Sequence, residues 1–385
     1  MAVPGLSTAD FGNQCKNLIE KLTQYAADNA EERRTRLALF GPNGYFRTPA
    51  LQQYRPLQNT IFGSDGIAYA ELKYLRRKHT VLTAASLDLC DPPSAAPYYS
   101  DTVALDNLTQ SAQGVKMAPL EWTRACESFE EAQMRRILSL VDATLVNAET
   151  AAMQQIIEGA GANATTAASI GVDGLRDMGD IIALNGTLSH DVYSKFYMDL
   201  LENEFEDTLP VIFHAYRSPW TAIERLRQYG CCNDAGIDQM SIAETAESAA
   251  AYLYKTRTIR TAFVNAVAAS DSYQGINGDT DYDDLSVILY PGAAHLLEYH
   301  AAEYAPYRHG LSTFLPWVDP VSGEQFDMKI TFTECDSEHN GMHSYAVSLV
   351  KQTQVYTMPT DQWNDSDALT GTNGIMLYKF SQATS

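Results

Sequence analysis

The chain has 385 residues, 45% of them hydrophobic, and a formal net charge of −21. This hydrophobic content is enough for a sizeable core, which excludes a wholly disordered chain. No run approaches the roughly 18 uninterrupted apolar residues of a membrane-spanning helix.

The charge is distributed unevenly along the chain. Residues 1–80 contain eleven Lys/Arg and seven Asp/Glu, whereas the remainder contains 16 Lys/Arg and 41 Asp/Glu. A strongly acidic body disfavours general nucleic-acid binding. The basic N-terminal part predicts contact with phosphates or with the acidic surface of a neighbouring copy, and the alternative is a solvated basic face without a partner.

Two further features bear on the compartment. The N-terminus lacks a secretory signal pattern, so we expect no export. The six cysteines show no CxxC pair and no metal-binding spacing, which predicts free thiols in a reducing compartment.

An amphipathic helix is predicted within residues 8–40. Its apolar side carries Phe11, Leu18, Ile19, Leu22 and Tyr25. Residues 41–66 contain three prolines and four glycines and are expected to form an extended loop, which folds onto another part of the molecule or is held by a partner. Residues 69–83 are ambiguous between helix and strand, and residues 90–102 are predicted as a loop because of Pro92 and Pro93.

The dominant feature is a long helix predicted from Ser128 to Glu158. Ser128 and Glu131 form a capping box, and Gly159 and Gly161 favour a left-handed C-terminal cap. Its length is on the order of 45 Å, and the alternative is an ordinary core helix. The apolar stripe consists of Met134, Ile137, Leu138, Val141, Leu145, Met153, Ile156 and Ile157.

A linker of small residues follows Gly161, and the region of roughly 165–325 reads as a compact α/β domain. Helices are predicted at 189–205 and 219–230 and at the beginning of 241–267, and a buried strand at Leu209–Tyr216. A second strand at 285–290 ends at a Pro291–Gly292 break, after which we expect a helix.

The C-terminal quarter is β in character. Strands are predicted at Met328–Cys335, Met342–Tyr356 and Gly374–Phe380, with a hairpin turn at Asn340–Gly341. The chain is therefore predicted to belong to the α+β class.

No catalytic, cofactor or metal site of weight emerges, so we expect a protein that is not an enzyme and needs no cofactor. Four patterns have a simpler interpretation than a site. His339 and His343 suit an exposed hairpin better than a metal site, and Cys231 and Cys232 suit two buried thiols better than a disulfide. The remaining two are acidic groups that suit a solvated loop (Asp279, Asp281, Asp283 and Asp284) and a solvated helix end (Glu202, Glu204, Glu206 and Asp207).

The order of these parts resembles the HK97-fold major capsid proteins of tailed bacteriophages. The segment 128–158 looks like their spine helix, and the strands within 326–385 look like their late strands. The resemblance implies an N-terminal arm at 1–55, an E-loop region at 56–110, a P-domain with the spine helix at 111–161, an A-domain at 162–325 and closing strands at 326–385.

The resemblance implies a structural protein that assembles as hexamers and pentamers into an icosahedral shell around double-stranded DNA. The expected location is the virion capsid, assembled in the host cytoplasm. Portal, scaffolding and decoration proteins are expected partners, with any scaffold supplied as a separate protein, and DNA contact would be non-specific. An encapsulin-like nanocompartment shell, another virion protein or a soluble α+β hydrolase remains an alternative. We also expect that a chain lacking residues 1–40 folds but does not assemble.

Overall fold

The computed structural model describes 18 segments of the chain, and the chain divides into two compact units. The described residues are 8–30, 37, 39–41, 44–47, 59–62, 68–75, 98–105, 108–117, 129–159, 175–180, 211–214, 257–260, 284–289, 292–304, 306–309, 311–336, 342–358 and 374–381. Unit 1 comprises 1–47, 107–151 and 298–354, and unit 2 comprises 48–106, 152–297 and 355–385. Among the described helices, none is long and apolar enough to cross a membrane.

Unit 1 is built on an antiparallel sheet with strand order β10-β11-β12-β13-β4. The strands are β4 (Thr109–Met117), β10 (Tyr307–His309), β11 (Ser312–Val318), β12 (Gln325–Asp336) and β13 (Met342–Thr357). A sixth strand, β9 (Ala294–Tyr299), pairs with β13 outside this order, and its residues up to Leu297 belong to unit 2. The helices are α1 (Thr8–Asp28), α3 (Phe129–Glu158), the one-turn α9 (Ala301–Tyr304) and the short 3₁₀ helix η1 (Tyr45–Arg47).

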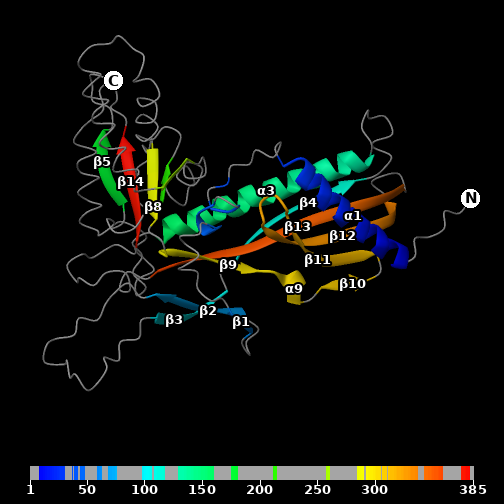
Figure 1. Ribbon diagram of the computed structural model, residues 1–385, viewed down its shortest axis with the longest axis horizontal. Helices are drawn as coiled ribbons and strands as arrows, with labels where there is room; N and C mark the ends of the chain where they lie inside the picture. Colours follow the sequence, from blue (N-terminus) through cyan, green and yellow to red (C-terminus); the bar gives the residue numbers. More distant parts are fainter. Residues whose placement is uncertain are drawn as a thin grey trace, which may run out of the picture. The chain divides into compact units, whose positions relative to one another are not determined.

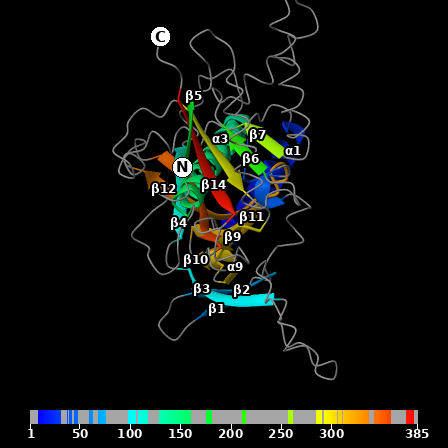
Figure 2. The same cartoon turned by 90° about the vertical axis from the view of Figure 1, so that its left-hand side faces the viewer.

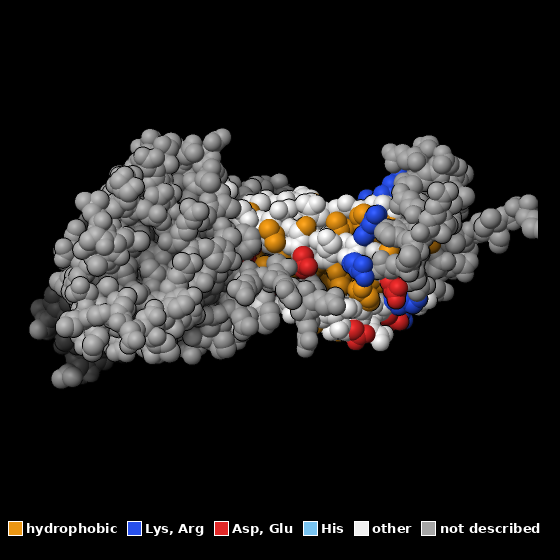
Figure 3. Space-filling model, turned by 90° about the horizontal axis from the view of Figure 1, so that it is seen from above, with side chains coloured by type: hydrophobic (Ala, Val, Ile, Leu, Met, Phe, Trp, Pro, Cys, Tyr) orange, Lys and Arg blue, Asp and Glu red, His pale blue; other side chains and the backbone are white. Residues whose placement is uncertain are grey.

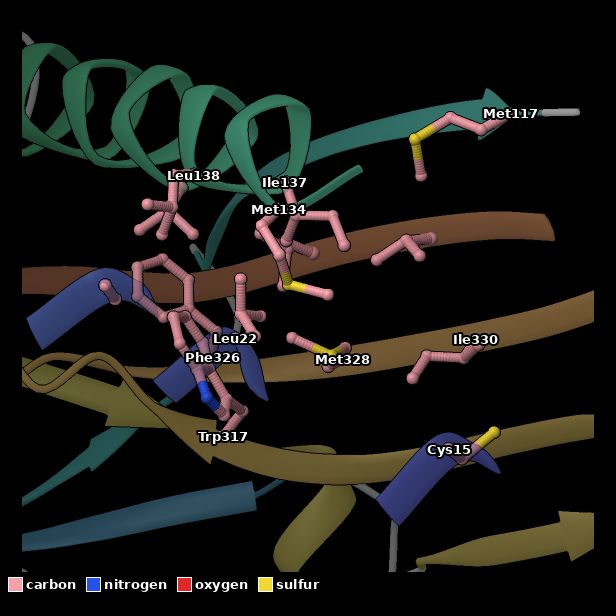
Figure 4. Packing of buried hydrophobic residues seen from close by; sticks show 14 of the residues in the cluster. Cys15, Leu22, Met117, Met134, Ile137, Leu138, Trp317, Phe326, Met328 and Ile330 are labelled. Atoms are coloured by element: carbon pink, nitrogen blue, oxygen red, sulfur yellow. The ribbon is translucent and has the colours of Figure 1, made fainter. Parts of the chain in front are cut away.

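The core of unit 1 lies between the helices and the sheet (Figure 4). Helix α3 contributes Ile137 and Leu138, while β12 and β13 contribute inward-facing residues such as Met328 and Leu349. These two residues are also register partners across the β12–β13 pair. The alternation of side chains along each strand therefore gives the sheet one apolar face, which the helices cover.

Helix α3 confirms the long helix predicted from the sequence (Figure 1). All eight residues of the predicted stripe are buried, from Met134 to Ile157. The predicted left-handed cap at Gly159 is wrong, because Gly159 does not have a positive φ. Among the described glycines, a positive φ occurs at others, such as Gly41 and Gly292. Gly159 has a packing role instead, because an added Cβ would lie 2.5 Å from Cγ2 of Thr357.

Helix α1 confirms the helix predicted within residues 8–40, and it packs on the same core. Leu22 is fully buried, and Leu18, Ile19 and Tyr25 pack against the cluster of buried residues. The Trp317 indole donates a hydrogen bond of 3.2 Å to the Thr23 hydroxyl, which ties α1 to β11. The side chain of Phe11 lies outside the described residues.

Unit 2 contains two further sheets (Figure 2). One is an antiparallel meander of β1 (Asn59–Phe62), β2 (Ala68–Leu75) and β3 (Tyr98–Ala104). The other has the order β5-β14-β8-β6-β7, with β5 (Leu175–Asp180), β6 (Val211–His214), β7 (Arg257–Arg260), β8 (Asp284–Leu289) and β14 (Ile375–Ser381). It is mixed, because β14 pairs parallel to β5 and antiparallel to β8.

Three predictions of local structure are wrong. The predicted loops at 41–66 and 90–102 contain strand β1 and the first part of β3, and the helix expected after Pro291 is strand β9 over Ala294–Tyr299. Short apolar runs do not distinguish helix from strand by themselves, and at β9 the pairing with the distant strand β13 decides. The ambiguous stretch 69–83 begins as strand β2.

The remaining strand predictions are confirmed, and several other predictions lie outside the described residues. Strands β6, β8, β12, β13 and β14 fall where strands were expected. The α+β class is confirmed by these strands together with α1 and α3. Outside the described residues lie Ser128, Gly161, the turn Asn340–Gly341, and the helices predicted at 189–205 and 219–230 and at the beginning of 241–267.

Candidate functional site

The most distinctive polar feature of unit 1 is a set of four charged side chains, which we call the ionic cluster: Arg47, Glu298, Glu324 and Lys351. The Lys351 ammonium lies 2.6 Å from Glu298 and 3.0 Å from Glu324. The Arg47 guanidinium donates to both oxygens of Glu324, at 3.0 and 2.9 Å, and lies 3.6 Å from Glu298. Two cations and two anions thus balance one another.

Burial distinguishes this cluster from a surface ion pair. The side chains of Glu324 and Lys351 are 0% exposed, and those of Arg47 and Glu298 are 25% and 18% exposed. The Lys351 ammonium also lies 5.2 Å from the centre of the Phe40 ring and 5.6 Å from that of Phe326. Aromatic faces and carboxylates together replace the water that a buried ammonium loses.

The strands position Glu324 and Lys351 by the same alternation that builds the core. Glu324 directly precedes β12 and continues its buried row of Phe326, Met328 and Ile330. Lys351 continues the buried row of Val347 and Leu349 on β13. One end of the apolar sheet face therefore becomes ionic.

The chain between α1 and β1 is held against this end of the sheet. We call residues 39–41 and 44–47 of this segment the docked loop; Leu39, Phe40, Tyr45 and Phe46 are buried. The buried Glu149 carboxylate of α3 accepts hydrogen bonds from the backbone N–H groups of Leu39 and Phe40, and the Gly41 N–H donates to Glu324 at 3.2 Å. The loop thus satisfies its backbone donors with buried carboxylates.

Two glycines allow the docked loop to turn. Gly41 has φ +81°, a left-handed conformation that glycine adopts without steric cost. At Gly44 an added Cβ would lie 2.3 Å from the Phe40 carbonyl oxygen. The turn is closed by the Phe46 N–H, which donates to the Leu39 carbonyl at 3.1 Å.

The hairpin between β11 and β12 orients Glu324. The buried Asp319 carboxylate accepts the Ser322 N–H at 3.1 Å and the Ser322 hydroxyl at 2.6 Å. The Asp319 N–H donates to the Glu324 carbonyl at 2.9 Å, and the Gly323 N–H donates to the Asp319 carbonyl at 2.8 Å. This turn fixes the backbone from which the Glu324 side chain reaches the cluster.

The electrostatics of the cluster favour anchoring over proton transfer. Burial alone raises the pKa of Glu324, but hydrogen bonds and charge from Arg47 and Lys351 outweigh it and lower the pKa from 4.5 to about 2. The hydrogen bond to Glu324 raises the pKa of Arg47 despite its burial. A carboxylate held ionised in this way is a poor general base at neutral pH, and the Arg47 guanidinium keeps its proton.

The described outer surface carries charges of both signs. Figure 3 shows Lys/Arg and Asp/Glu side chains next to one another on one face. On α1, for example, Lys16 lies 3.9 Å from Glu20, with side chains 77% and 65% exposed. Such an exposed pair contributes little to stability, unlike the buried cluster.

The patterns considered as sites from the sequence are not brought together in the described part of the chain. His343 lies in strand β13, so it lacks the helical spacing of a zinc motif, and Asp284 begins β8. Within the described residues, no group of three His, Cys, Asp or Glu side chains is arranged to hold a metal ion. Outside them lie His339, Cys231, Cys232, Asp279, Asp281, Asp283, Glu202, Glu204, Glu206 and Asp207.

Sequence reasoning missed the ionic cluster and the contact of Glu149 with the docked loop, although each had one signal in the sequence. Lys351 interrupts the alternating apolar row of a long predicted strand, and Glu149 lies among the buried residues of α3, between Leu145 and Ala152. A charge at an inward-facing position implies a buried partner. No signal in the sequence identified Glu324 as the partner of Lys351, or Arg47 as the second partner of Glu324.

Comparisons with known proteins give matches at the level of structure alone. No protein-family model matches the chain, and the curated proteins contain no match. Similar solved structures include the capsid of cyanophage Pam1 (11% identity, 89% of this chain and 94% of that chain, TM-score 0.44) and of cyanophage P-SCSP1u (10%, 86% and 90%, 0.41). The capsid of Ralstonia phage GP4 matches at 10% identity over 82% and 84%, with a TM-score of 0.41. All three are structures of phage capsids.

Proposed function

We propose that this chain is a major capsid protein that self-assembles into an icosahedral shell enclosing double-stranded DNA. The observation that carries the proposal is the construction of unit 1. A 30-residue helix packs along an antiparallel sheet whose two central strands have 12 and 16 residues. This matches the spine helix and long strands expected of an HK97-type P-domain, so the argument is one of architecture.

The proposed division into parts follows the same analogy. Residues 1–55 are the N-terminal arm, 56–110 the E-loop region, 111–161 the P-domain with the spine helix, 162–325 the A-domain and 326–385 the closing strands. The meander β1-β2-β3 lies within the E-loop region and suits an extended hairpin. Part of the proposed arm, helix α1 and the docked loop, packs on the core of unit 1 in the same chain.

The charge and the buried polar groups suit a structural role. A net charge of −21 disfavours tight binding of packaged DNA, so DNA contact would be non-specific. The ionic cluster is internally neutralised, as expected of an anchor. We propose that the chain forms hexamers and pentamers, with portal, scaffolding and decoration proteins as partners, and that it assembles in the host cytoplasm.

Electron microscopy of the purified full-length protein, together with sedimentation, tests this proposal. We expect closed shells, or rings of six and five subunits. Shell diameter and DNA content separate a phage capsid from an encapsulin-like nanocompartment, which would be smaller and free of DNA. A uniform population near 42.5 kDa at high concentration would overturn the proposal and favour a soluble α+β enzyme.

A further inference from the structure

Strand β4 forms one edge of the sheet of unit 1, and this edge is long and regular. Its nine residues pair one to one with β13, from Thr109 opposite Thr353 to Met117 opposite Tyr345, without a register shift. Within the described residues, no strand pairs with the other side of β4. Alternate residues of an edge strand direct their N–H and C=O groups away from the sheet, so this side is a template for a further strand.

Strand β4 lacks the features that usually protect a sheet edge. Proteins shorten their edge strands or interrupt them with proline, bulges or inward-facing charges. The opposite edge of the same sheet follows this rule, because β10 has only three residues. Strand β4 contains no proline, and its one charged residue, Lys116, lies on the face of the strand opposite to the buried Met117. A partner strand therefore has the whole length of β4 to pair with.

The charge of β4 favours a second copy of this chain as the partner. The chain has a net charge of −21, so two copies repel one another. Strand β4 contains one Lys and no Asp or Glu. It thus offers two copies a surface at which they approach one another without bringing carboxylates together.

An antiparallel pairing of β4 with its own copy also separates the two lysines. When the pairing is centred on Gln113, Lys116 of each copy lies opposite Gln110 of the other, so no like charges are opposed. The two Lys116 residues are then six positions apart along the strands, which is about 20 Å. This distance exceeds the screening length of about 8 Å at physiological ionic strength.

The same register keeps the buried face of the sheet continuous. Directly opposite residues share a face, so Val115 of each copy lies opposite Ser111 of the other on the buried side. Val115 is only partly buried against the hydrophobic core of unit 1, and a neighbouring strand covers it further. On the other face, the exposed and small Ala112 lies opposite Gly114, so no large side chain obstructs the contact.

We propose that β4 is the interaction surface for a second copy of this chain, and that two β4 strands pair antiparallel about a two-fold axis at Gln113. The sheets of the two subunits then form one continuous sheet. Each copy uses the same residues, as a two-fold contact requires. This contact rests on the proposed function, because assembly into a shell is what brings the copies together.

Oxidative crosslinking of cysteine variants of the full-length protein tests the pairing. Gln113→Cys places two thiols opposite one another, within reach of a disulfide. Gln110→Cys is the matched control, because it makes the same change on the same strand with the two thiols about 20 Å apart. After mild oxidation we expect at least about tenfold more disulfide-linked dimer in Gln113→Cys than in Gln110→Cys or the unmodified protein. Non-reducing electrophoresis measures the dimer, and mass spectrometry identifies the linked peptides.

A second pair of variants tests the register, and it replaces the first if Gln113→Cys does not fold. Gln110→Cys and Lys116→Cys, assembled together, should link to each other, whereas neither should link to itself. Equal linkage at positions 113 and 110 would overturn the pairing.

Electron microscopy of the same samples separates this contact from the proposed function. Shells in which neither Gln113→Cys nor the mixed pair is linked would overturn the pairing alone and assign the edge of β4 to another segment. Linked dimers that form no shells would support the pairing and overturn the proposed function. A monomeric protein without linkage would overturn both.

Discussion

At the scale of single residues, Lys351 and Glu324 show how charges are kept inside unit 1. Each is fully buried, and each has an opposite charge within 3.0 Å. Lys351 also pairs with Glu298, and Glu324 also pairs with Arg47, so the two positive and two negative charges cancel. A buried ion pair of this kind is weak evidence for high stability, but breaking it is costly, because an unpaired charge then remains in the interior.

Glu324→Gln is therefore expected to lower the free energy of unfolding by about 3 to 5 kcal/mol. It leaves Arg47 and Lys351 with one carboxylate between them. Chemical denaturation followed by circular dichroism measures the change, and Glu20→Gln on the exposed face of α1 is the control, with an expected effect within about 0.5 kcal/mol. A loss below about 1 kcal/mol in Glu324→Gln would contradict this account of the cluster.

His295 predicts a dependence of stability on pH in unit 2. Burial lowers its pKa from 6.5 to about 4, although a hydrogen bond that His295 donates to the Gly292 backbone opposes this effect. Between these values the unfolded chain binds a proton that the folded chain does not, so stability falls as pH drops from 6.5 towards 4. The full difference corresponds to about 3 kcal/mol.

Urea unfolding at a series of pH values between 8 and 4 measures this effect. The variant His295→Gln should show a shallower fall than the unmodified protein, whatever its stability at pH 8. Equal slopes in the two proteins would show that His295 is protonated as readily in the folded as in the unfolded chain. Glu324 adds a second loss at lower pH, because its depressed pKa places its contribution between 4.5 and about 2.

At the scale of elements, α3 is fixed by two different kinds of contact along its length. Its first turns bury apolar residues such as Ile137 and Val141 against the sheet. Further along, Glu149 holds the docked loop through the loop's backbone, and the Gln155 side chain accepts the Val355 N–H at 2.7 Å. The helix is therefore both a packing surface and a row of hydrogen-bond acceptors.

Leu145→Pro is expected to abolish soluble folding. Proline removes a hydrogen bond in the middle of α3 and clashes with the preceding turn, which costs about 3 kcal/mol or more, and a fully packed leucine is lost as well. The fraction of soluble protein and its circular dichroism measure the outcome. Leu145→Ala, which loses the packing but keeps the helix, should remain soluble, so an equally insoluble Leu145→Ala would point to packing alone.

At the scale of the whole molecule, the N-terminal helix is part of the fold and not only of an arm. Cys15, Leu22 and Ala26 of α1 belong to the hydrophobic core of unit 1, and the docked loop adds Phe40 and Tyr45 as buried aromatic residues. The expectation that a chain without residues 1–40 still folds conflicts with this packing. Removing them exposes one face of the core.

We therefore expect that deletion of residues 1–28 gives an unstable or insoluble protein. The thermal unfolding midpoint and the yield of soluble protein measure this effect. A surface variant of the same helix, Lys16→Gln, should leave both unchanged, because the Lys16 side chain is 77% exposed. A truncated protein with the normal unfolding midpoint would show that α1 contributes no stability.

The sequence by itself determined the elements whose pattern is long and locally consistent. The stripe from Met134 to Ile157 predicted α3, and the alternation after Met328 and Met342 predicted β12 and β13. These patterns repeat over many turns or residue pairs, so no distant contact is needed to recognise them.

Only the tertiary structure decided the short strands and the ionic cluster. Strand β9 has an apolar run that suits a helix equally well, and its pairing with β13 settles the conformation. Arg47 and Glu324 lie 277 positions apart, and the hydrogen bonds between them exist because the docked loop and the β11–β12 hairpin meet over one end of the sheet. Such a contact depends on which distant segments the fold brings together, and no local periodicity encodes that choice.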